Sequence, residues 1–362
     1  MTNFERWDKE FRAQRLYAFN HNEDALLWLK TRAVCRSRQL RPFLVENSIS
    51  LTSTKLAEQN AELFALLENT PGAIRMLDDY LRVRHNDWYV SMGIDEEKLK
   101  NDLYRIRNYE WGGDRNNSLD KHLVSKYVKP ISSYDELSAR KMEIEGNAWN
   151  YVQTSWYNNW TSFLIESLFK RHERVVSAIG EIKSVDFFID DVPIDLKVTF
   201  MPSQFIGEKL KRKLGKRELP WLKAQAKTVG IKVDPSMSYA QQMYVITERL
   251  AEQGHTDILD MLAVKRREVV REAEEDATEL MSWLYTNQGE MRFGAENRLF
   301  IVLADTSDLS QSWKMKRAFS LIEPKVTEYL NKFCDDTLKE VTFTFNKETY
   351  KSLADIIFIT KE

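Results

Sequence analysis

The sequence predicts an α/β protein with a mixed central sheet flanked by helices and a mainly helical N-terminal region. Three observations predict this class. Apolar residues recur mainly at helical spacing through residues 1–145, whereas residues 146–362 alternate helical segments with short β-branched or aromatic ones. A tight hairpin is expected at residues 184–199. A continuous apolar run at residues 299–304 is typical of a buried strand. We therefore expect a helical region at residues 1–145 and an α/β domain at residues 146–362.

The N-terminal region is expected to be built from helices at residues 4–30, 55–68, 73–84 and 95–109. Ser53 or Thr54 can cap the second of these, and Pro71 with Gly72 separates it from the third. An acidic first turn favours the start of the fourth helix. This arrangement is compatible with a DNA-reading helical module and equally with an ordinary helical bundle, which is the simpler interpretation.

The C-terminal part is expected to alternate helices and strands. An aromatic-rich helix precedes the hairpin, and further helices, a buried strand, another helix and two strands follow it. This order is typical of a mixed sheet with helices packed on it. The expected helices lie at residues 148–174, 239–252, 256–285 and 313–333, and the later strands at residues 299–304, 341–345 and 355–360.

The hairpin turns at Asp190 and Asp191, because mostly β-branched or aromatic residues stand on both sides of this pair. A two-residue turn fixes the register and alternates hydrogen-bonded with non-hydrogen-bonded pairs. Pro193 then falls at a non-bonded position, where its missing N–H costs nothing. The expected partners are Ile189 with Val192, Phe188 with Pro193, Phe187 with Ile194, and Asp186 with Asp195.

The two faces of this hairpin differ in chemistry. One is continuously apolar and suits a core, with Phe187, Ile189, Val192, Ile194, Leu196 and Val198. The other carries Asp186, Asp195, Lys197 and Thr199. Carboxylates directly opposite one another destabilise a sheet unless a cation accompanies them. Lys197 supplies one cation on the same face, and a divalent metal would supply a better one. The preceding helix can present Glu166 towards this face, with Asn159 and Ser162 on its own side.

A basic stretch follows at residues 207–227, with eight Lys or Arg against two Glu. Such a stretch suits contact with a phosphate backbone, although a solvated helix face is the alternative. The candidate DNA contacts are Lys209, Lys211, Arg212, Lys213, Lys216, Arg217, Trp221 and Lys223.

The overall composition argues against a membrane-spanning or secreted protein and gives no general sign of nucleic-acid binding. The net charge of −2 does not by itself indicate a nucleic-acid partner, so any surface that binds nucleic acid must be a local basic patch. No apolar run approaches membrane-spanning length, and the polar N-terminus does not resemble a signal peptide. The two cysteines form neither a metal motif nor a disulfide framework, so we expect a cytoplasmic protein. No phosphate-cradling glycine loop occurs, which argues against ATP dependence.

Glu166, Asp186 and Asp195-Leu196-Lys197 occur in that order on an expected helix, strand and strand. This pattern resembles the PD-(D/E)XK nuclease superfamily and its restriction-endonuclease-like fold. The resemblance covers roughly residues 150–200. Val185 stands where the named motif has proline.

The resemblance implies a metal-dependent endonuclease that hydrolyses phosphodiester bonds of double-stranded DNA, with a type II restriction or phage-defence role as the leading expectation. Mg²⁺, or Mn²⁺ in its place, would be bound by Asp186, Asp195 and the Leu196 carbonyl, and Glu166 would complete the site. Lys197 would orient or deprotonate the attacking water. Thr199 and Asn159 are further candidates for phosphate or outer contacts.

The resemblance also implies a homodimer, which would cut both strands. Three alternatives stay open at this point. One is a nuclease of repair or recombination, and another is a nuclease that cuts RNA. The third is a DNA-binding protein without catalytic activity.

Overall fold

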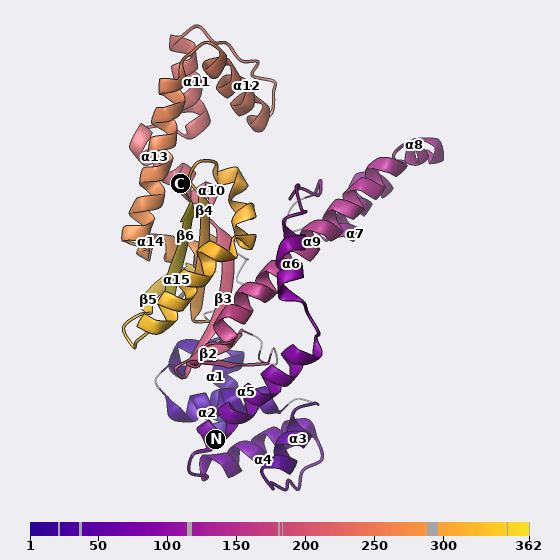
Figure 1. Ribbon diagram of the computed structural model, residues 1–362, viewed down its shortest axis with the longest axis vertical. Helices are drawn as coiled ribbons and strands as arrows, with labels where there is room; N and C mark the ends of the chain where they lie inside the picture. Colours follow the sequence, from indigo (N-terminus) through magenta and orange to yellow (C-terminus); the bar gives the residue numbers. More distant parts are fainter. Residues whose placement is uncertain are drawn as a thin grey trace.

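The computed structural model describes residues 1–20, 22–35, 38–113, 118–179, 182, 184–287, 296–345 and 347–361. The fold is α/β, as the sequence predicts, with a six-stranded mixed sheet and helices packed around it. Figure 1 shows an elongated molecule with the N-terminal helices at one end and the sheet in the middle. No helix of the described residues is both long enough and apolar enough to cross a membrane.

The N-terminal helices form a bundle with its own apolar core. The expected helix at residues 4–30 is interrupted, because Thr2 caps a first helix and Asn22 caps a second. The helix expected from residue 55 has Lys55 as its N-cap without a side-chain hydrogen bond, so neither Ser53 nor Thr54 caps it. The elements are α1 (Asn3–Arg12), η1 (Leu16–Phe19), α2 (Glu23–Val34), α3 (Leu40–Glu46), α4 (Leu56–Glu68) and α5 (Ala73–Ser91).

Short elements lead from the bundle to α9 (Lys141–Lys170), the long aromatic helix. The first turn of α6 is acidic as expected, and Asp95 caps it, but this helix ends at Leu103, well before residue 109. The boundary expected after residue 145 lies inside α9, which is continuous across it. The bundle core also includes Val176 and Phe188 from the sheet. The connecting elements are α6 (Glu96–Leu103), α7 (Leu119–Leu123), η2 (Val124–Val128) and α8 (Tyr134–Ala139).

The sheet has the strand order β1-β2-β3-β4-β6-β5. The three central strands β3, β4 and β6 are parallel, and the outer pairings are antiparallel. All strands expected from the sequence are present, together with β1, which the sequence did not predict. The strands are β1 (Val175–Ser177), β2 (Phe187–Ile189), β3 (Val192–Phe200), β4 (Arg298–Asp305), β5 (Lys339–Phe345) and β6 (Glu348–Lys361).

Helices cover both faces of the sheet. On one face α9 and α15 (Phe319–Lys332) share a core with Leu299, Ile301 and Leu303 of β4, and η3 (Leu309–Arg317) joins them. On the other face lie α10, α13 and α14, against Phe300 and Val302. In Figure 1, α11 and α12 extend this second layer beyond the sheet. The bounds are α10 (Ser203–Leu214), α11 (Glu218–Thr228), α12 (Tyr239–Glu252), α13 (Thr256–Glu275) and α14 (Thr278–Asn287).

Two of the expected C-terminal helices are divided. The helix expected at residues 256–285 breaks at Asp276, whose carboxylate accepts a hydrogen bond from the Thr278 N–H at 3.0 Å. The helix expected at residues 313–333 is a 3₁₀ segment followed by α15. Asx-type bonds of this kind compete with helix continuation, which explains the first break.

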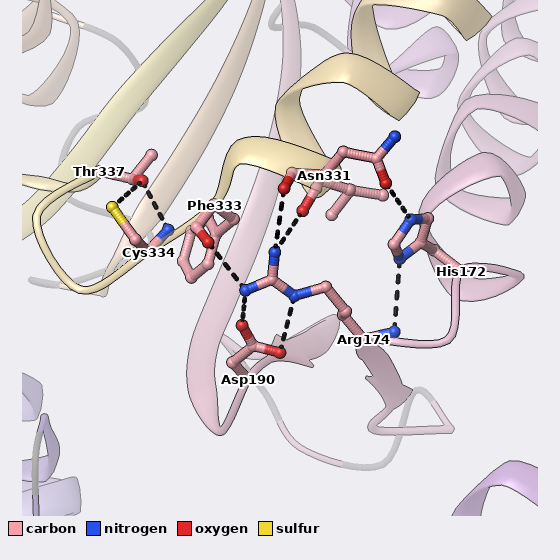
Figure 2. Close-up of polar contacts among 8 residues, drawn as sticks. His172, Arg174, Asp190, Asn331, Phe333, Cys334 and Thr337 are labelled. Atoms are coloured by element: carbon pink, nitrogen blue, oxygen red, sulfur yellow. Dashed lines mark hydrogen bonds and ion pairs between the residues drawn. The ribbon is translucent and has the colours of Figure 1, made fainter.

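The hairpin turn is fastened from two sides. Asp190 and Asp191 both have positive φ, 43° and 71°, as a two-residue primed turn requires. Lys30 of α2, fully buried, forms ion pairs with Asp191 and with Asp78 of α5. Arg174 forms an ion pair with Asp190 and also donates to the carbonyls of Leu330 at 2.7 Å and Phe333 at 2.8 Å (Figure 2). The turn therefore joins the N-terminal bundle to the end of α15.

We expect Arg174→Ala to lower the free energy of unfolding by about 2 kcal/mol, because it removes charge-assisted hydrogen bonds to Asp190 and to helix-end carbonyls. Urea unfolding followed by circular dichroism measures the change. Arg105→Ala is the matched control, since Arg105 is 81% exposed and its ion pair with Asp102 contributes under about 1 kcal/mol. Equal losses in the two variants would contradict the role of Arg174.

Candidate active site

The hairpin has the register that the sequence predicts. Ile189 pairs with Val192, Phe188 with Pro193, and Phe187 with Ile194. The predicted apolar face is also confirmed, since Phe187, Ile189 and Ile194 are buried in the core beneath α9 and α15. Val192, Leu196 and Val198 pack against the same core.

The ladder of the hairpin ends at Phe187, although the Asp186 N–H still donates to the Ile194 carbonyl at 2.8 Å. The expected direct pairing of Asp186 with Asp195 does not occur in the ladder. The Asp195 N–H points to the other edge of β3 and donates to the Asn297 carbonyl beside β4 at 2.9 Å. The Asp186 carboxylate takes the place of the missing strand and accepts the Leu196 N–H at 2.8 Å. The N–H and carbonyl of one strand residue point to the same edge, so the Leu196 carbonyl also faces this outer edge.

Asp195 lies between two cations on β3 and β4. Its Oδ1 accepts a hydrogen bond from Lys197 Nζ at 2.6 Å, and its Oδ2 lies 3.3 Å from Arg298 Nε. The carboxylate is 6% exposed, whereas Lys197 is 33% exposed. The buried acid therefore has its charge balanced inside the fold, and the lysine beside it reaches solvent.

Glu166 of α9 completes the predicted group. It forms an ion pair with Lys170, one helical turn on, and its side chain is 32% exposed. Its charge, together with that of Asp195, acts on Asp186. The structure thus places Asp186, just before β2, beside Asp195 and Lys197 of β3, with the charge of Glu166 near Asp186. However, α9 packs on the apolar face of the sheet, so the expectation that it presents Glu166 on the face of Asp195 and Lys197 is wrong.

Asp186 carries the least compensated charge of this group. Burial raises its pKa to about 6, and the nearby carboxylates of Asp195 and Glu166 add to the rise, whereas the Leu196 N–H and Lys197 oppose it. A divalent cation beside Asp186 would favour its ionised form.

In metal-free protein, Asp186 should make stability fall as pH rises from about 4 to above 6. The folded state holds this proton up to its raised pKa, about 6, whereas the unfolded state releases it near 3.8. The fold therefore loses about 3 kcal/mol across this window. Urea unfolding in EDTA at pH 4.5 and 7.5 measures it, and Asp186→Asn should remove this part of the slope. Identical slopes in both proteins would contradict the assignment.

Two buried charges that the sequence analysis missed, Arg298 and Glu296, stand behind Asp195. Arg298 Nη2 lies 3.1 Å from Glu296 Oε2, and its guanidinium carbon lies 4.7 Å from the centre of the Tyr285 ring. The Tyr285 hydroxyl donates to the Glu296 carbonyl at 2.7 Å. Burial raises the pKa of Glu296, which a hydrogen bond from Ser184 and the charge of Arg298 oppose. Arg298 is thus a fixed internal cation for Asp195.

The donor atoms of this group are of the chemical type that magnesium prefers. The carboxylates of Asp186 and Asp195 and the Leu196 carbonyl are hard oxygen donors. Asp195 Oδ2 is buried and accepts no hydrogen bond within the described chain, so one acceptor position is unused. However, no three His, Cys, Asp or Glu side chains of the described residues converge closely enough to hold a metal ion together.

Comparisons with known proteins identify no relative of this chain. No protein-family model matches the chain, and no curated protein or solved structure matches it significantly. The function is therefore inferred from this group of side chains and from the fold.

The predicted DNA contacts are divided between ion pairs, core and surface. Lys209 and Arg212 pair with Glu279, and Lys213 pairs with Glu272 at 2.5 Å. Trp221 is 8% exposed and lies in the core beside α10. The remaining predicted contacts reach the surface. Lys211, Lys216 and Arg217 are exposed, and Lys223 is half-buried.

The two additional candidates lie near the group. Asn159 is exposed on α9, two turns before Glu166. Thr199 follows Lys197 on the same face of β3 and is half-buried.

Proposed function

We propose that this protein is a magnesium-dependent endonuclease that hydrolyses phosphodiester bonds in double-stranded DNA. The observation that carries the proposal is the proximity of Asp186, Asp195 and Lys197 where the ladder of β2 and β3 ends, with the charge of Glu166 acting on Asp186. A metal-binding carboxylate pair with a lysine at its side is the arrangement that attack of water on an anionic phosphate needs.

Each side chain has a role that follows from its position. Asp186 and Asp195 would hold the metal, with the Leu196 carbonyl at the same edge. When bound, the metal supplies charge neutralisation and acidifies water. Lys197, 33% exposed, donates to the phosphate oxygens or orients the attacking water. Glu166 would orient water at the opening of the site.

The proposed fold type is restriction-endonuclease-like. A hairpin that carries the acids, a helix before it and a mixed sheet after it support this assignment. A restriction or phage-defence role, action as a homodimer and a cytoplasmic location belong to the same proposal. The non-catalytic alternative is disfavoured, because Asp186 is held in a costly environment that a pure binding protein has no need to keep.

Incubation with supercoiled plasmid in Mg²⁺ or Mn²⁺, with an EDTA control, tests this function. Discrete linear fragments would support a sequence-specific endonuclease, and a smear would indicate a non-specific one. A parallel incubation with structured RNA separates a ribonuclease. DNA that is shifted in a gel but uncut with every metal would reject the proposal in favour of a binding protein.

The exposed basic residues should contribute to DNA affinity through phosphate contacts. Replacing Lys211, Lys216 and Arg217 together by Ala should weaken binding and reduce the slope of log affinity against log salt by up to about 3, roughly one for each lost contact. Fluorescence anisotropy with a labelled duplex at several salt concentrations measures this slope. Replacing Lys332, 74% exposed on α15, is the matched control. An unchanged slope in the triple variant would exclude this surface from binding.

A further inference from the structure

The carboxyl ends of β3 and β4 form a topological switch point. The chain leaves β3 into α10, which packs on the face of Phe300 and Val302. It leaves β4 into η3 and α15, which pack on the opposite face with Leu299 and Ile301. Ligands of open α/β sheets bind in the crevice that such divergent connections create. A cavity of about 540 Å³ opens at this point.

The charged residues of the cavity wall are compensated within the wall. Glu218 forms an ion pair with Arg266. The Asp308 carboxylate accepts hydrogen bonds from the N–H of Ser310 at 2.9 Å and from its hydroxyl at 2.7 Å. The wall therefore offers no uncompensated cation of its own for a phosphate group.

The rest of the wall suits a flat, neutral ligand with hydrogen-bonding edges. Phe200 and Trp283 supply aromatic surface from β3 and α14, and Gln204 supplies an amide from the first turn of α10. Trp313 of η3 also lines the cavity, but it is buried, with Tyr109 stacked on its ring. Aromatic walls with a few polar groups are the surroundings in which proteins hold an unstacked nucleobase.

The cavity lies next to the proposed active site along β3. Thr199, which lines the cavity, stands two residues after Lys197 on the same face of the strand. This spacing corresponds to about 7 Å. A DNA strand whose phosphate lies at Lys197 therefore has a neighbouring nucleoside within reach of the cavity.

We propose that this cavity receives one base of the substrate strand, turned out of the duplex next to the phosphate that is cut. The proposal rests on the nuclease function above. It assigns recognition of that base to the amide of Gln204 and to the aromatic wall. The exposed basic residues of α10 and of the turn before α11 would contact the backbone instead.

Photocrosslinking tests the assignment. Lys197→Met protein is bound in Mg²⁺ to DNA fragments that contain 5-iodo-2′-deoxyuridine in place of thymidine, irradiated, digested and analysed by mass spectrometry. Crosslinks are expected on Phe200, Trp283 or Trp313. In otherwise wild-type protein, Gln204→Trp, a change at an exposed position, fills the cavity. It should lower kcat/KM about tenfold, in line with the loss of a stacked base. In the Lys197→Met background it should abolish these crosslinks.

The failures of the two proposals are distinguishable. If wild-type protein cuts DNA but the crosslinks lie only on α10 and α11 lysines, and Gln204→Trp cuts normally, the cavity assignment is overturned and the nuclease function stands. If wild-type protein cuts no DNA with any metal, the nuclease function is rejected, and the cavity assignment is rejected with it.

Discussion

Lys197→Met should reduce plasmid cleavage by about 10²-fold to 10⁴-fold, the range for loss of a group that moves or orients a proton. Methionine keeps most of the length of the side chain and removes its charge, and Arg298 remains beside the buried Asp195 as its second cation. Initial rates of supercoiled plasmid conversion in saturating Mg²⁺ measure the effect. Asp195→Asn should cause a loss at least as large, because it removes a metal ligand.

The control must separate chemistry from binding. Lys325→Met replaces an exposed lysine of α15 and should cleave at the wild-type rate. Gel shifts in Ca²⁺ should show that Lys197→Met binds duplex DNA as tightly as wild-type protein. Cleavage that survives both Lys197→Met and Asp195→Asn would refute the site.

Lys30→Met should cause the largest loss of stability among the predicted changes, about 3 kcal/mol, because it leaves Asp78 and Asp191 without their shared, fully buried cation. This is the low end for a broken buried pair, since Asp191 is 53% exposed. Chemical denaturation at pH 7 measures the loss. Lys55→Met is the matched control, because Lys55 is 79% exposed.

The loss should also depend on pH. Burial raises the pKa of Asp78, and Lys30 is the main group that opposes the rise. Without Lys30 the folded state would hold a proton on Asp78 to a higher pH, so the variant should lose more stability at pH 8 than at pH 5. Lys30→Met/Asp78→Asn should recover part of the loss. A double variant no more stable than Lys30→Met would show that the carboxylate is not the cause.

The sequence predicted the parts of the fold that depend on local chemistry. The two-aspartate turn fixed the hairpin register correctly, because a two-residue turn permits one register only. The same reasoning extended the ladder by one pair too many. The Leu196 N–H donates to the Asp186 carboxylate instead of to the partner strand. The Asp195 N–H donates to Asn297, about 100 residues away in the sequence, which local patterns do not predict.

Arg298 could not be found from the sequence for the same reason. It stands at the start of an apolar run that was recognised as a strand, but the run itself does not say that β4 lies beside β3 with Arg298 opposite Asp195. The basic stretch at residues 207–227 shows that a local count of charges does not reveal their ion-pair partners. Its charges were counted correctly, yet Glu272 and Glu279, which pair with several of them, lie more than 50 residues further on.

The fastening of the hairpin turn has a consequence for engineering this protein. Lys30 and Arg174 pair with the two turn residues of the hairpin that carries Asp186 and Asp195, and Phe188 and Val176 are buried by the N-terminal bundle. Residues 146–362 should therefore not fold normally when they are fused to another protein without the bundle. A fusion that keeps the chain from its first residue would preserve the hairpin, whereas one that begins at α9 would expose its underside to water.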